Sequence, residues 1–149
     1  MIRIVTLCIC IIVLSTGIAN ASLNITEIAW MGTADSQYGE WFEIYNDSDQ
    51  DIDLSGWKLY EDDGAQLVFT FSKSIPANNY LLVERTTASS PDPVPGINDE
   101  SGSFSGSGFA NTGENLVLKD SSGSIIESLD FLSGWPAGNS DTKETMQWN

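Results

Sequence analysis

Short strand-like runs separated by turn residues make up nearly the whole chain after residue 22, and no stretch there has the period of an amphipathic helix. The clearest run is residues 66–72, in which Leu67, Phe69 and Phe71 face one way and the polar residues Gln66, Thr70 and Ser72 face the other. This alternation is typical of a strand with one buried face. About seven such runs, with turn chemistry between them, predict an all-β fold, an immunoglobulin-like β-sandwich.

The turn residues place the remaining elements. Residues 61–64 end in Asp-Gly, which favours a tight hairpin turn, and the stretch 86–113 is rich in Ser, Pro and Gly, which predicts a long surface loop with a flexible part at 106–113. The predicted extended segments are 23–30, with a bulge near Glu27, and 40–46, 52–54, 57–60, 66–72, 80–84, 115–119 and 125–132.

Residues 40–46, Glu-Trp-Phe-Glu-Ile-Tyr-Asn, show how one strand divides its faces. Alternate side chains of a strand share a face, so Phe42 and Ile44 are expected in the core, whereas Trp41, Glu43 and Tyr45 lie on the opposite face. We predict that these three form a binding surface for a glycan or a protein. The alternative is that the 86–113 loop covers the rings and makes them a secondary core.

The inward positions of the other runs complete the expected core. Trp57 is assigned there because many sandwiches bury one tryptophan. The predicted core residues are Phe42, Ile44, Leu54, Trp57, Leu59, Leu67, Phe69, Phe71 and Leu82.

The N-terminus has the pattern of a secretory signal peptide. Arg3 precedes an apolar run from Ile4 to Leu14, and Ala-Asn-Ala follows at residues 19–21. We predict a signal peptide over 1–21 and one domain over 22–149, which makes the protein secreted or displayed at the cell surface; retention of the apolar run as an anchor is the alternative. Cys8 and Cys10 lie inside the apolar run, so the mature domain is expected to fold without a disulfide.

The composition limits the possible chemistry. A net charge of −15 disfavours nucleic-acid binding, because that function needs a basic face. The chain has no histidine, and without a cysteine after residue 21 it lacks the usual nucleophile–base pairs and common zinc ligands. We therefore predict that the domain is not an enzyme.

Four alternating aspartates are the one chemical motif. Asp47, Asp49, Asp51 and Asp53 supply the oxygen ligands that calcium prefers, but the spacing lacks the glycine and glutamate of an EF-hand loop. In an extended strand such residues stand about 6.6 Å apart, so they bind one ion only if the segment curls. A calcium site and a solvated turn are the two interpretations; no other cofactor is expected.

Three segments together resemble the lamin-tail domain family. They are the Glu40-Trp41 strand, the Leu-Ser-Gly-Trp sequence at residues 54–57, and the turn at Pro76 that leads into the strand beginning at Tyr80. The resemblance implies an immunoglobulin-like sandwich without a catalytic motif, used as an interaction module in exported bacterial proteins. Asparagines at 78–79 replace a glycine that is frequent in the family, which asparagine can imitate because it tolerates positive φ.

These observations predict a non-catalytic, exported binding or adhesion module at the cell surface, with a protein or glycan partner. Two alternatives stand beside it: a glycan-binding module that targets a larger hydrolase, and a calcium-binding spacer. The final residues, with Met146 and Trp148 on one face, look like the start of a further strand, so we expect the chain to be truncated there.

Overall fold

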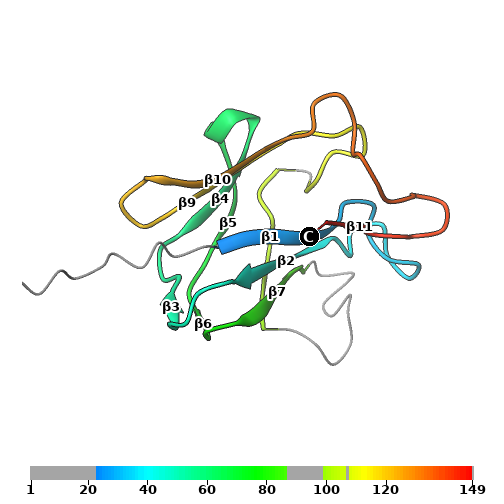
Figure 1. Ribbon diagram of the computed structural model, residues 1–149. Coiled ribbons are helices and arrows are strands. Elements are labelled where there is room, and N and C mark those ends of the chain that lie inside the picture. Colours follow the sequence, from blue (N-terminus) through cyan, green and yellow to red (C-terminus); the bar gives the residue numbers. More distant parts are fainter. Residues whose placement is uncertain (1–22, 87–98, 107, 149) are drawn as a thin grey trace, which may run out of the picture.

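The computed structural model describes residues 23–86, 99–106 and 108–148, so the predicted signal peptide lies outside the described residues. These residues form a β-sandwich of two main sheets (Figure 1). The first, here called the β2 sheet, has the order β11 (Met146–Gln147), β1 (Leu23–Ala29), β2 (Trp41–Asn46), β7 (Asn79–Arg85) and β8 (Glu100–Gly102). The second, the β4 sheet, has the order β10 (Ile125–Asp130), β9 (Asn115–Lys119), β4 (Lys58–Glu61) and β5 (Gln66–Thr70).

Strand pairing is antiparallel throughout the described residues except between β7 and β8, which run parallel. A short pair, β3 (Ile52–Asp53) with β6 (Ser74–Ile75), lies beside the main sheets. The predicted sandwich and the bulge near Glu27 are confirmed, since the β1–β2 register shifts between Ile25 and Glu27. Asn78 has φ +50°, as its place in the turn requires.

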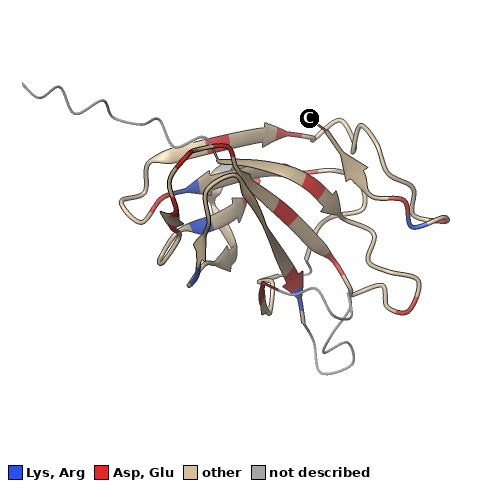
Figure 2. Cartoon of the chain, turned by 60° about the horizontal axis from the view of Figure 1, so that its bottom comes forward, with Lys and Arg blue, Asp and Glu red and all other residues tan. Residues whose placement is uncertain are grey.

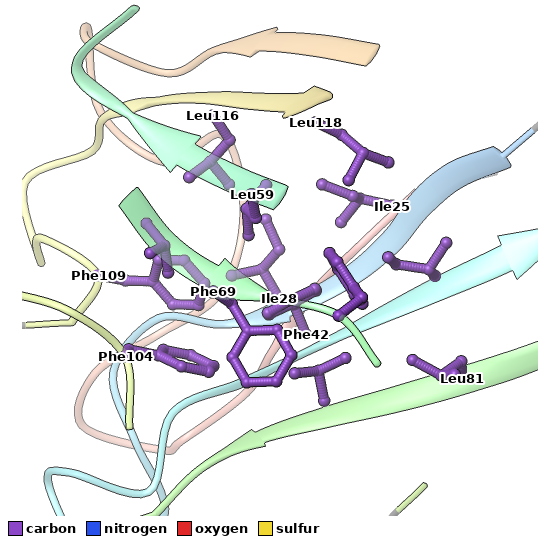
Figure 3. Packing of buried hydrophobic residues seen from close by; sticks show 14 of the residues in the cluster. Ile25, Ile28, Phe42, Leu59, Phe69, Leu81, Phe104, Phe109, Leu116 and Leu118 are labelled. Atoms are coloured by element: carbon purple, nitrogen blue, oxygen red, sulfur yellow. The ribbon is translucent and has the colours of Figure 1, made fainter. Parts of the chain in front are cut away.

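Phe42 is the centre of the core. Its side chain is fully buried, and its ring lies 5.7–6.5 Å from the rings of Phe69, Phe71, Phe104 and Phe109. Figure 3 shows the rings of Phe42, Phe69, Phe104 and Phe109 between the two sheets, with aliphatic residues of β1 and β9 above and beside them. Edge-on and tilted contacts of this kind add about 0.5–1.5 kcal/mol each beyond the burial of the rings.

One of the predicted core positions, Leu67, is corrected, and a second, Leu82, is buried as predicted but outside the main cluster. The β4–β5 register pairs Leu59 with Phe69 and Tyr60 with Leu67, so Val68 is an extra residue in β5. Because of this bulge, Val68 is buried, with 1% exposure, and Leu67 is only half-buried.

Leu82 is buried too, but it lies opposite Glu43 on the outer face of the β2 sheet. Its neighbours Leu81 and Val83 occupy the core instead. The other predicted core residues, namely Phe42, Ile44, Leu54, Trp57, Leu59, Phe69 and Phe71, all lie in the buried cluster.

The stretch 86–113 is not simply a surface loop. It contains β8, and both Phe104 and Phe109 insert into the core. Segment 106–113 is fixed in its described part, because the carbonyl of Ala110 accepts a hydrogen bond from the indole of Trp135 at 2.7 Å. Residues 87–98 of this stretch lie outside the described residues.

The predicted hairpin turn at 61–64 is also different in detail. Residues Asp62–Gly64 form a 3₁₀ turn, η1, with positive φ at Asp62 and Gly64. The predicted segments 115–119 and 125–132 form β9 and β10, which pair as a hairpin, and the Asp120 carboxylate accepts main-chain hydrogen bonds from Ser122 and Ser124 in its turn.

The interior also holds carboxyl groups. The Glu40 carboxylate accepts a hydrogen bond from the Arg85 guanidinium at 2.5 Å, and Glu61 and Glu114 are buried close to them. Burial raises the pKa of Glu40 from 4.5 to about 7, although Arg85 acts in the opposite direction. Burial, and then a hydrogen bond to Glu61, raise the pKa of Glu114 well above its usual range.

These raised pKa values predict that the domain is most stable in mild acid. Between pH 4.5 and about 7 the unfolded chain releases protons that the folded Glu40 and Glu114 retain, so the free energy of unfolding falls by up to about 1.4 kcal/mol per pH unit for each group. Urea titrations at pH 5 and pH 8 measure this loss. Glu114→Gln, which keeps a donor for Glu61, is expected to reduce the pH dependence, whereas Glu144→Gln at an exposed position should leave it unchanged. The same change in the free energy of unfolding between pH 5 and pH 8 in the parent and in both variants would contradict this account.

Trp57 and Trp41 should differ in their contribution to stability. Trp57 is buried in the bend between β3 and β4, where its main-chain N–H donates to Leu54 and its carbonyl accepts from Phe71. Trp41 is half-buried on the outer face of β2. We expect Trp57→Ala to lower the free energy of unfolding by about 3–5 kcal/mol and Trp41→Ala by clearly less. Equal losses in a denaturant titration would mean that the burial of the two rings does not decide their contributions.

Candidate functional site

The three residues predicted as a binding surface do share one face of β2. Trp41, Glu43 and Tyr45 are each half-buried, and all three lie opposite the face that carries Phe42 and Ile44. Their surroundings differ along the strand, however. Trp41 packs against the hydrophobic cluster, whereas Glu43 and Tyr45 line hollows in the surface. The structure therefore brings Glu43 and Tyr45 together with other residues and leaves Trp41 beside the core.

Tyr45 is paired with a second tyrosine. The β2–β7 register places Tyr80 directly opposite Tyr45, and the two ring centroids are 4.5 Å apart. Tyr80 is 51% exposed, so this pair presents aromatic surface to solvent. The sequence analysis assigned Tyr80 to a strand but not to the site, because the pairing depends on the register between two strands that lie far apart in the sequence.

Trp148 brings a third ring to the same place. Its main-chain N–H donates to the carbonyl of Thr26 at 3.2 Å, which fixes the end of the chain against β1. The indole packs edge-on against Phe131 at 5.9 Å and remains half-buried. The sequence pattern placed Met146 and Trp148 on one face of a strand, and the structure has a strand there, β11. The pattern did not indicate which residues contact Trp148.

Two hollows, of about 450 and about 270 Å³, share Thr26, Tyr80 and Trp148 in their walls. We call them together the sheet-face groove. Its remaining wall consists mostly of polar and acidic side chains, and none of the described residues that line it is a Lys or Arg. These other lining residues are Asn24, Ile25, Glu27, Glu43, Tyr45, Asp47, Glu127 and Gln147.

Hydrogen bonds hold the carboxylates of the groove in place. Glu43 accepts from the Thr26 hydroxyl at 2.7 Å, and Glu127 accepts from the main-chain N–H of Ile25 at 2.7 Å, at the bulge in β1. Glu27 accepts from Gln147 at 2.5 Å. Partial burial raises the pKa of Glu43, which Glu27 and Asp99 raise further, and burial also raises the pKa of Glu127.

The groove can therefore do two things chemically. Its rings offer flat apolar faces for stacking, and its fixed carboxylates accept hydrogen bonds at defined positions. Preorganised acceptors beside aromatic surface suit a ligand that has hydroxyl groups and no negative charge, because all the charged side chains among the described residues that line the groove are carboxylates.

The alternating aspartates are distributed over separate hydrogen bonds. Asp49 accepts from the Asn78 amide, Asp51 from the main-chain N–H of Ala77, and Asp53 from that of Ser55. Asp47 lines the sheet-face groove. In the part of the chain that the structure describes, no group of three or more Asp, Glu, His or Cys residues is arranged to hold a metal ion.

Comparison with known proteins identifies the family. The sequence matches the family described as Lamin Tail Domain over residues 16–133, and no curated protein is significantly similar to it. Residues 23–86, 99–106 and 108–148 contain no helix with the length and apolar character that a membrane crossing needs. The matched range covers every strand of the two main sheets except β11, and it includes the three segments that resemble the family. The chain belongs to the lamin-tail domain family, whose members are immunoglobulin-like domains that are not typically catalytic.

Proposed function

We propose that this lamin-tail domain is an exported, non-catalytic binding module that holds a neutral glycan chain in the sheet-face groove at the cell surface. One observation carries the proposal. The rings of Tyr45, Tyr80 and Trp148 line a single groove together with carboxylates that are already hydrogen-bonded in position. Sugar rings stack on aromatic faces through their C–H groups, and their hydroxyls donate to carboxylates.

The electrostatics of the groove support a neutral ligand. Four carboxylates, from Glu27, Glu43, Asp47 and Glu127, line it, and the chain as a whole carries a net charge of −15. Figure 2 shows acidic positions on strands and loops alike, with few basic ones between them. This surface would repel an acidic polymer, whereas an uncharged polymer would meet no electrostatic repulsion here.

Export is proposed from the signal-peptide pattern of residues 1–21. Because no cysteine follows residue 21, a domain exported in this way relies on its core instead of on disulfides. The Phe42-centred core of this domain is of that kind. A protein partner in the same groove is the second candidate, because tyrosine and tryptophan are also the residues that most often anchor protein interfaces.

The test is to remove the exposed tyrosine pair. Tyr45→Ser with Tyr80→Ser should abolish or reduce at least about tenfold the binding of neutral β-glucan, xylan or chitin hexasaccharides on an array, because two stacking faces are lost. Tyr60→Ser is the matched control, since Tyr60 is half-buried on the β4 sheet and lines neither hollow of the groove. The control should bind like the parent.

The same variants and three further observations separate the alternatives. A folded double variant that keeps every interaction of the parent would exclude the groove. Parent protein that captures no glycan, but retains a surface protein in a pull-down that the double variant loses, would favour the protein partner. A melting temperature that drops in EDTA would favour the calcium-binding spacer, and a hydrolase encoded next to this domain would favour the targeting module.

A further inference from the structure

A third hollow lies at the other end of β2 from the sheet-face groove. It forms where the connection between β1 and β2 meets segments 109–111 and 140–143, and its volume is about 440 Å³. That size is within the range of small-ligand sites. Glu40 lines this hollow and Tyr45 lines the groove, and five residues of strand correspond to about 16 Å. We call the hollow the loop-end pocket.

The inner wall of the loop-end pocket is rigid. Arg85, at the end of β7, donates to Glu40 at 2.5 Å, and both side chains are more than nine-tenths buried although they line the pocket. The main chain of Phe109 donates a hydrogen bond to Glu40. Gly108 has φ +81°, and a Cβ there would collide with both Glu40 and Arg85, so the backbone lies directly on the ion pair. The guanidinium is thus held at one place in the wall.

The rim adds a ring and a second cation. Tyr38 is 43% exposed, and its ring centroid is 5.5 Å from the guanidinium carbon of Arg85. Lys143 has φ +62°, a conformation that lysine rarely adopts, and its Nζ donates to the carbonyl of Met31 at 3.0 Å. Gln37 and Asn111 supply amide groups beside them.

The charge of this pocket differs from that of the rest of the molecule. The described residues include five basic side chains, Lys58, Lys73, Arg85, Lys119 and Lys143, and two of them line this one pocket. The sheet-face groove has none among its described lining residues. In a chain of net charge −15, an anionic ligand is therefore most favourably placed here, and a guanidinium has five N–H donors with which to hold a carboxylate.

We propose that the loop-end pocket binds a hexuronic acid residue, a sugar ring that carries a carboxylate. Arg85 and Lys143 recognise the carboxylate, the Tyr38 ring stacks on the sugar, and Gln37 and Asn111 bind hydroxyl groups. This site is distinct from the groove of the proposed function, and neither depends on the other.

Glu40 makes the binding dependent on pH. The charged groups that face Glu40 are Arg85 of β7, Glu61 of β4 and Glu114, which directly precedes β9. Glu40 also shares the pocket with Tyr38 and Lys143. Its pKa is raised by burial to about 7, so below that pH it is neutral and leaves the two cations of the pocket without an opposing charge. A hexuronate, whose carboxyl group resembles those of Asp and Glu, is ionised across this range. Binding is therefore tighter at pH 5.5 than at pH 8.

The test uses a matched pair of ligands. Methyl β-D-glucuronide and methyl β-D-glucoside differ only in the carboxylate, and each is titrated into the ¹⁵N-labelled domain at pH 5.5 and pH 8 while amide chemical shifts are followed. The glucuronide should shift amides at 37–40, 109–111 and 140–143, with an affinity at least about threefold higher at pH 5.5, and the glucoside should not. Shifts confined to the groove residues would report on the proposed function instead.

Variants assign the effect to the pocket. Lys143→Gln should weaken glucuronide binding about threefold, while Lys58→Gln on the β4 sheet should leave it unchanged. Glu40→Gln imitates the neutral carboxyl group and should remove the pH dependence; should it fail to fold, the pH comparison on the parent and on Lys143→Gln still decides. Equal shifts from both ligands, or no shift around the pocket at either pH, would overturn the proposal.

Discussion

The division of β2 into two faces is the constraint on which the rest of the structure depends. Phe42 and Ile44 on its inner face are fully buried, and the Phe42 ring contacts aromatic residues from β5 and from the segment after β8. Shifting β2 by one residue would expose these side chains and bury Glu43. The pairing of β2 with both β1 and β7 fixes the register, and the same register places Tyr45 opposite Tyr80 on the outside. β2 therefore contributes residues both to the core and to the candidate site.

Polar groups terminate this strand at both ends. At one end, Asn46 is fully buried, and its amide donates to the carbonyls of Gln50 and Pro76 while its Oδ1 accepts from Ser48. At the other, Glu40 pairs with Arg85 beneath the backbone of Gly108. Each arrangement satisfies groups that would be costly to bury alone, and each ties loops to the sandwich. The groove and the loop-end pocket lie next to these two ends, so both surfaces rest on fixed elements.

The sandwich fold, the two-faced pattern of residues 40–46 and the bulge near Glu27 could be predicted, because they depend on local alternation and turn chemistry. The bulge at Val68 could not, since its effect appears only when β5 pairs with β4. The same holds for Phe104 and Phe109, which lie in a stretch rich in Ser and Gly but enter the core through contacts with Phe42. Tyr80 and Trp148 were missed as site residues for a related reason: the site is made by register and by the return of the chain along β1, neither of which is local.

The claim that the outer face of β2 is the binding surface is tested most directly by mapping a bound ligand on the parent protein. A neutral hexasaccharide of β-glucan, xylan or chitin is titrated into the ¹⁵N-labelled domain, and the amide and indole signals that change are located on the structure. Our account predicts changes at 24–27, 43–47 and 80 and at the indole of Trp148, all of which lie along the sheet-face groove. Changes concentrated on the outer face of β4 and β9 instead, with the signals of Tyr45 and Tyr80 unaltered at saturation, would contradict it.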